Sequence, residues 1–202
     1  TAFKLADEDT ETKVIIITGS GEKAFVAGAD ISEFSNYDSE EGAALSKEGQ
    51  KLLFDFIENL STPVIAAVNG FARAGGFEIL VAADLVVIAD EARIGDLHVA
   101  SGLPPGAGAT FRSRNKLGEQ RAKALLFSAG TLTGPEAVAA GLALTSVPRS
   151  ELTDAVNKLV STFNRSPRNA LAKTKAGFTQ TQGLTNKQSW EVEIGLFREF
   201  LL

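Results

Sequence analysis

The chain has 202 residues, of which 44% are hydrophobic, so it is long enough for one domain with a sizeable core. Its net charge of −5, without clustered Lys and Arg, argues against a nucleic-acid or anionic-membrane partner. The absence of cysteine excludes disulfides, thiolate metal sites and a cysteine nucleophile.

No apolar run reaches the roughly twenty residues of a membrane span, and the first residues lack the layout of a signal peptide. We therefore expect a soluble protein of the cytoplasm or an organelle matrix. The chain has no methionine and begins with Thr1, which indicates a piece of a longer product.

Four short apolar runs predict buried β-strands, because they are rich in β-branched residues and are closed by turn residues. They are continuously apolar rather than alternating, which favours a sheet that is covered on both faces. The runs are residues 14–18, 63–68, 85–89 and 142–147.

Apolar residues at helical spacing predict helices between these strands. The first covers residues 38–60, and Asp38 and Glu41 are placed there like a capping box. Three more follow at 75–83, 119–128 and 135–140. The alternation of strands and helices predicts an α/β fold.

From residue 151 onward the pattern is helical only, in the segments ELTDAVNKLVSTFN, ALAKTKAGFTQ and NKQSWEVEIGLFREFLL. The last segment carries many apolar side chains with little polar cover. Two interpretations stay open: this helix packs on a neighbouring subunit, or it packs back on its own core. The side chains concerned are Trp190, Val192, Ile194, Leu196, Phe197 and Phe200.

Two glycine-rich loops lack the rest of a nucleotide-binding motif. GSGEKA (19–24) has the glycine spacing of a dinucleotide-binding loop, but the residues after it have no helical period to hold a pyrophosphate. PPGAGAT (104–110) lacks the Gly-Lys-Ser/Thr of a phosphate-binding loop.

The segment NGFARAGGFEIL (69–80) is more informative. A strand ends before it, and a helix opens on Gly75 and Gly76 with Glu78 one turn in. Free backbone N–H groups at a helix start suit a developing oxyanion, and the glycines let a carbonyl approach. The alternative is a surface glutamate that stabilises the helix dipole. The apolar neighbours of Glu78 favour a buried carboxylate with a shifted pKa.

The stretch PVIAAVNGFARAGGFEILVAADLVVIADEARIG resembles the central segment of the crotonase, or enoyl-CoA hydratase/isomerase, superfamily, and KAFVAGADISEF is similar to the segment that supplies the other half of its site. The resemblance continues through GLPPGAGATFR and LLFSAGTLTGPEAVAAGL into the helical tail. It implies a crotonase-type spiral of ββα units with a helical C-terminal region, divided into a core at 1–148 and an oligomerisation region at 149–202. It also implies a homotrimer or a dimer of trimers, although the family's opening β-hairpin and final helix have no counterpart in this chain.

The resemblance also implies an acyl-CoA site. The matching backbone N–H groups, which hold the thioester oxygen and stabilise an enolate, belong to Ala29 and Gly75, and Glu78 matches the glutamate that acts on water. The implied reaction is reversible hydration of a 2-enoyl-CoA, with coenzyme A as part of the substrate and no metal or redox cofactor. The residues matched to the coenzyme A and reaction pocket are Ala27, Ala29, Asp30, Ile31, Gly75 and Gly106.

One position departs from the hydratase pattern. Where hydratases carry a second glutamate, this chain has His98, its only histidine. His98 or Asp96 is a candidate for the second acid/base, and a pocket-lining histidine without a catalytic task is the alternative. Two further functions stay open: a lyase or hydrolase that uses Glu78 and His98, and a catalytically idle acyl-CoA binder. Arg73 replaces an apolar family residue, and either binds a coenzyme A phosphate or a substrate carboxylate, or points into solvent.

Overall fold

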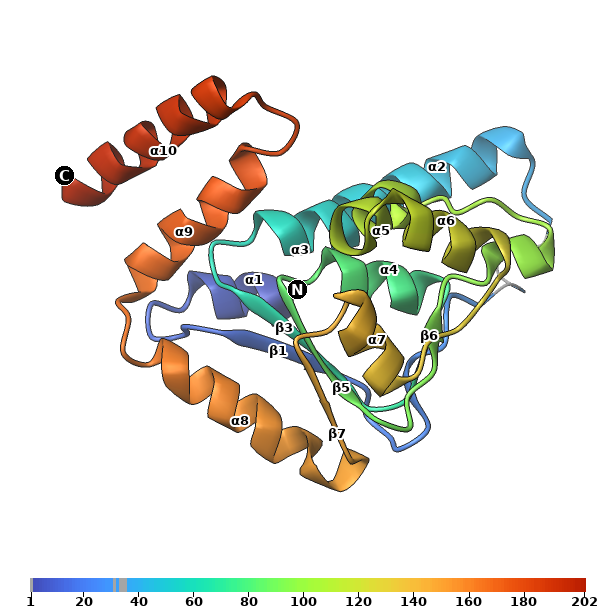
Figure 1. Ribbon diagram of the computed structural model, residues 1–202. Coiled ribbons are helices and arrows are strands. Elements are labelled where there is room, and N and C mark those ends of the chain that lie inside the picture. Colours follow the sequence, from blue (N-terminus) through green and yellow to red (C-terminus); the bar gives the residue numbers. More distant parts are fainter. Residues whose placement is uncertain (1, 31, 33–35) are drawn as a thin grey trace.

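The computed structural model describes residues 2–30, 32 and 36–202 (Figure 1). Its strands form two parallel sheets, one of four strands in the order β1-β3-β5-β7 and one of three in the order β2-β4-β6. The larger sheet comprises β1 (Ile15–Thr18), β3 (Val64–Val68), β5 (Leu85–Ala89) and β7 (Thr145–Val147). The smaller comprises β2 (Ala24–Val26), β4 (Phe71–Arg73) and β6 (Ile94–Gly95).

The chain winds as a spiral, because each of three turns gives one strand to each sheet before a helical segment returns it. This confirms the predicted spiral of ββα units and all four predicted strands. The strands of the smaller sheet were not predicted, since runs of two or three residues are too short to show a period.

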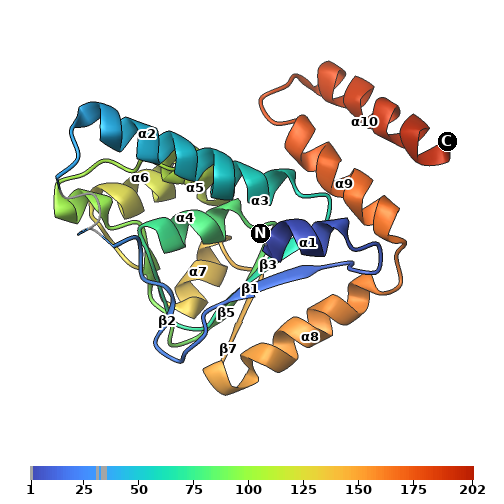
Figure 2. The same ribbon diagram turned by 180° about the vertical axis from the view of Figure 1, so that it is seen from behind.

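The helical segments lie between and after these strands (Figures 1 and 2). They are α1 (Ala2–Glu8), α2 (Ser39–Gly49), the π-helical η2 (Gln50–Phe54), α3 (Asp55–Asn59), α4 (Gly75–Ala82), the 3₁₀ turn η3 (His98–Ser101), α5 (Ala109–Leu117), α6 (Glu119–Phe127), α7 (Gly134–Ala140), the 3₁₀ turn η4 (Arg149–Glu151), α8 (Leu152–Phe163), α9 (Arg168–Gln180) and α10 (Asn186–Leu201). The predicted helix at 38–60 is thus one helical stretch with a π-helical middle. Helix α5 was missed because its buried side carries Arg112 and Ser113, so it shows no apolar period.

The larger sheet is covered on both faces, as the continuous apolar strands predicted. On one face Val64, Ala66 and Val68 of β3 join the main core. On the other face Ile65 and Ala67 pack with residues of α8. Figure 2 shows α8 alone on its side of the sheet, opposite the other core helices.

Helix α10 lies on α9, beyond the sheet core (Figures 1 and 2). Of its apolar side chains Leu196 is buried, whereas Trp190 and Phe197 are 62% and 64% exposed. The middle of α9 is tied to the core by the buried Lys175, whose Nζ lies 2.7 Å from Asp84 Oδ2. Among the described residues no helix is long and apolar enough to cross a membrane.

The start of α2 has the capping box that the sequence predicted. Asp38 accepts hydrogen bonds from the N–H groups of Glu40 and Glu41, and the Glu41 side chain accepts from the Asp38 N–H. We expect Asp38→Ala to lower the free energy of unfolding by about 1 kcal/mol, because these N–H groups lose their acceptor. Urea unfolding measures this change. Asp38→Asn keeps an acceptor and is the matched control, so an equal loss in both variants would contradict the capping role.

Candidate active site

The segments AGAD and ARAGG meet at one end of the smaller sheet. AGAD (27–30) follows β2, and ARAGG (72–76) begins in the last two residues of β4. These strands are parallel neighbours, so both segments leave the sheet at the same edge. Two close approaches fix the contact: a Cβ added to Gly28 would lie 3.4 Å from Cβ of Ala74, and one added to Gly76 would lie 2.0 Å from the carbonyl oxygen of Val26. Gly76 is therefore required for α4 to pack on β2.

Helix α4 begins at this junction. Its N-cap, Ala74, has a positive φ of 47°, and the Ala74 N–H donates to the carbonyl oxygen of Asp96 at 2.9 Å. Gly75 follows as the first helical residue, so its own N–H has no acceptor within the helix. Among the described residues, none has an atom within 4 Å of a Cβ added at Gly75. Within the part of the chain that the structure describes, this open space and the N–H of Gly75 suit an incoming carbonyl oxygen.

The other half of the predicted pocket lies on the surface. Ala27, Ala29 and Asp30 are exposed, and Ile31 lies outside the described residues. The Asp30 carboxylate accepts hydrogen bonds from the N–H and hydroxyl of Ser32, which lower its pKa.

Glu78 occupies the first turn of α4 and is 3% exposed. Its Oε1 accepts a hydrogen bond from the N–H of Ala107 at 2.9 Å. Burial raises the pKa of Glu78, and the Ala107 hydrogen bond and the nearby His98 oppose that shift in part. A buried carboxylate with a raised pKa exchanges protons closer to neutral pH than an ordinary glutamate does.

The loop that holds Glu78 is fixed from two helices. The Gly106 carbonyl accepts a hydrogen bond from the hydroxyl of Ser46 on α2. The Ala107 carbonyl accepts one from Nη1 of Arg112 at 2.9 Å, and Arg112, 2% exposed, also pairs with Glu58 on α3. Gly106 was predicted from the sequence, but these partners were not. Ala107 acts through its backbone N–H, which carries no signal in the sequence.

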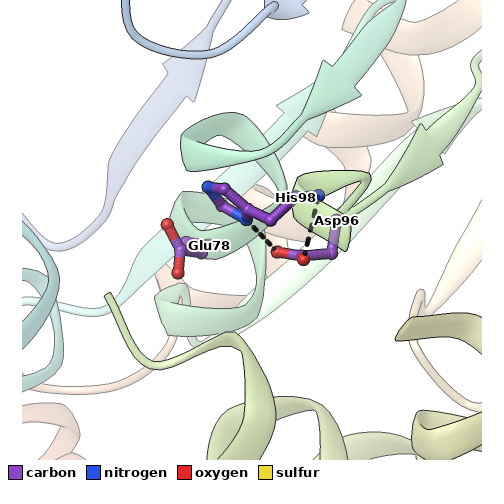
Figure 3. A group of neighbouring side chains, drawn as sticks. All are labelled: Glu78, Asp96 and His98. Carbon is purple, nitrogen blue, oxygen red and sulfur yellow. Dashed lines mark hydrogen bonds and ion pairs between the residues drawn. The ribbon is translucent and has the colours of Figure 1, made fainter. Parts of the chain in front are cut away.

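His98 lies beside Glu78 and is held by Asp96 (Figure 3). The His98 side chain is 21% exposed, whereas that of Asp96 is fully buried. His98 Nδ1 lies 2.9 Å from Asp96 Oδ1. This hydrogen bond is the largest cause of the raised pKa of His98, burial opposes it, and the charges of Asp96 and Glu78 add to it.

One polar atom from each of Glu78, Asp96 and His98 lies within 4.8 Å of the other two. Carboxylates and an imidazole at this spacing can bind a divalent cation. Here the Asp96 and His98 atoms bind each other, and Glu78 Oε1 accepts from Ala107. Glu78 and His98 also shift each other's pKa, so the cluster holds two coupled groups that can exchange protons.

Comparison with known proteins decides the family. The sequence model of the enoyl-CoA hydratase/isomerase family matches residues 1–201. The chain belongs to this family. Among curated members of the enoyl-CoA hydratase/isomerase family, the chain is 42% identical to the short-chain-enoyl-CoA hydratase of Clostridium acetobutylicum over 159 residues, covering 77% of this chain and 60% of that one. It is 35% identical to the crotonyl-CoA hydratase of Syntrophomonas wolfei over 196 residues, covering 97% of this chain and 75% of that one.

Solved structures of the enoyl-CoA hydratase/isomerase family have the same fold. The enoyl-CoA hydratase from Bacillus anthracis superimposes with a TM-score of 0.91 at 28% identity, covering 98% of this chain and 76% of that one. The enoyl-CoA hydratase subunit I from Geobacillus kaustophilus superimposes with a TM-score of 0.91 at 30% identity, covering 99% of this chain and 76% of that one. The chain thus spans about three fifths to three quarters of these relatives.

Arg73, which departs from the family pattern, is exposed. Its guanidinium carbon lies 4.5 Å from the centre of the Phe71 ring, so the side chain stacks on its own strand.

Proposed function

We propose that this chain catalyses the reversible hydration of a 2-enoyl-CoA. The observation that carries the proposal is a pair of titrating groups next to the start of α4, where the N–H of Gly75 has no acceptor within the helix. These groups are the buried Glu78 and His98, which is hydrogen-bonded to Asp96. The names of two relatives, short-chain-enoyl-CoA hydratase and crotonyl-CoA hydratase, support the same reaction. Coenzyme A enters as part of the substrate, and the scheme uses no other cofactor.

In this scheme the N–H groups of Ala29 and Gly75 bind the thioester oxygen. Negative charge builds on that oxygen when water attacks the β-carbon, so donors fixed in advance stabilise the transition state more than the ground state. Ala27 and Asp30, in the loop after β2, and Gly106, in the loop before α5, line the pocket for the coenzyme A and acyl parts of the substrate.

The two titrating groups divide the proton transfers. Ionised Glu78 takes a proton from the water whose oxygen bonds to the β-carbon, and the π electrons of the double bond move onto the thioester as an enolate. Protonated His98 then donates a proton to the α-carbon. The hydration product leaves a protonated Glu78 and a neutral His98, which are the forms that dehydration needs, so one site serves both directions.

The test follows the absorbance of crotonyl-CoA as the enoyl thioester is consumed. We expect turnover to 3-hydroxybutyryl-CoA, with no release of free coenzyme A. Release of thiol would instead support the hydrolase alternative. Measurable coenzyme A affinity without turnover of any enoyl or 3-hydroxyacyl thioester would contradict the proposal and support an idle binder.

For residues 149–202 we propose a role in assembly as a homotrimer or dimer of trimers. Phe178, Trp190 and Phe197 expose 77%, 62% and 64% of their surface, and a groove of about 570 Å³ between α9 and α10 includes Phe178 and Phe197. Apolar side chains at such exposure are typical of a surface that a partner covers.

Light scattering should give a mass of three or six times that of the 21.3-kDa chain, and Phe197→Glu should lower that mass. A monomeric wild-type chain would contradict the assignment.

A further inference from the structure

Asp96 connects the two parts of the proposed site. It lies between β6 and η3 and is fully buried. Its carboxylate forms two hydrogen bonds with His98. Oδ1 lies 2.9 Å from the ring nitrogen Nδ1, and Oδ2 accepts from the backbone N–H at 3.4 Å. Its carbonyl oxygen accepts the Ala74 N–H, which fixes the residue before Gly75. A buried carboxylate with these partners is committed to His98 rather than open to substrate.

The backbone at Leu97, between Asp96 and His98, has a strained conformation that allows these two hydrogen bonds. Leu97 has a positive φ of 57°, a left-handed conformation that an L side chain seldom adopts. The turn brings both the ring and the backbone N–H of His98 back onto one carboxylate. Strain of this kind persists where surrounding contacts over-determine it, and it is concentrated at functional sites.

We infer that Asp96 is a positioning residue that holds His98 with a proton on Nδ1, so that Nε2 is the atom that exchanges protons with substrate. An ionised carboxylate only accepts hydrogen bonds, so the nitrogen facing it must carry hydrogen in both charge states of the ring. Figure 3 shows the other ring nitrogen pointing away from Asp96, on the side where the Glu78 carboxylate lies. The inference rests on the proposed function for its catalytic meaning, but the tautomer can be measured without it.

Among the residues that the structure describes, few charged groups shift the pKa of His98. Asp96 and Glu78 are the charged groups that raise its pKa, and the hydrogen bond from Asp96 is the larger cause. Helix α6 also packs against η3, but its Lys123 pairs with Glu119 and its Arg121 donates to a backbone carbonyl. Removing the charge of Asp96 should therefore lower the pKa of His98 more than removing that of Glu78.

Because His98 is the only histidine in the chain, its ring gives one unambiguous set of NMR signals. In the wild-type chain at alkaline pH we expect ¹⁵N shifts of a neutral ring protonated on Nδ1, and a titration midpoint above 6.5. The midpoint should fall in Asp96→Asn and fall less in Glu78→Gln. Asp154→Asn, on the exposed side of α8, is the matched control and should leave it unchanged.

Kinetics supply the second readout. Hydration needs protonated His98, so lowering the pKa of His98 moves the alkaline limb of the kcat profile to lower pH. We expect Asp96→Asn to make that shift and to lower kcat by about 10- to 100-fold, with KM little changed. A purely structural role would lower activity without moving the limb.

The outcomes separate the inference from the proposed function. A neutral ring protonated on Nε2 in the wild-type chain overturns the inference, and this measurement needs no variant that folds. So does an Asp96→Asn variant whose His98 midpoint matches that of Asp154→Asn. If the tautomer and midpoints behave as expected but no enoyl thioester is hydrated, the proposed function fails while the Asp96–His98 pair stands.

Discussion

Glu78→Gln should lower kcat for hydration of crotonyl-CoA by about 10²- to 10⁴-fold, because an amide cannot take a proton from the attacking water. The substitution preserves shape. The amide oxygen of glutamine can still accept the hydrogen bond that Ala107 donates to Glu78 Oε1 at 2.9 Å. The loss should therefore fall on kcat more than on KM.

The same variant should be at least as stable as the wild-type chain near pH 7. Burial raises the folded-state pKa of Glu78 above its ordinary value of 4.5. A group with a raised pKa contributes stability below its unfolded-state pKa, and this contribution is lost as the pH rises through the folded-state pKa. At neutral pH the ionised glutamate thus costs stability that glutamine does not, which urea unfolding would show.

Glu11→Gln, at an exposed position before β1, is the matched control and should keep full activity. Unchanged hydration in Glu78→Gln would remove Glu78 from the mechanism. A stable fold with lost activity separates a chemical effect from unfolding.

His98→Ala should lower kcat by about 10²- to 10³-fold, since the α-carbon then lacks its proton donor. Added imidazole should restore part of the activity, because the truncated side chain leaves space beside Asp96 and Glu78. The wild-type profile should fall below the pKa of Glu78 and above that of His98, both of which are raised, and the alkaline limb should disappear in the variant.

Val99→Ala, at an exposed position one residue further along η3, controls for truncation of a side chain in this turn. If His98→Ala keeps wild-type activity, His98 only lines the pocket. Asp96 is then a poor candidate for the proton donor to the α-carbon, because it is fully buried and its Oδ1 faces the His98 ring.

The elements predicted correctly from the sequence are those with local signals. The strands of the larger sheet are continuous apolar runs, and α2 begins at a capping box within four residues of chain. The placement of Gly75 and Glu78 at the start of one helix was likewise predicted from a local signal, and both lie in the first turn of α4. A β-branched run or a cap residue acts through its immediate neighbours, so its effect can be read without the fold.

Only the tertiary structure shows how His98 and Asp96 lie relative to each other and to Glu78. From the sequence, His98 and Asp96 were alternative candidates for the second acid/base. In the structure they form a hydrogen bond with each other across a turn in which Leu97 has a left-handed conformation. The structure also supplied the N–H of Ala107, 29 residues from Glu78 in the chain. Such contacts depend on which segments the spiral brings to one edge, and a backbone N–H is the same group in nearly every residue type, so no local pattern marks it.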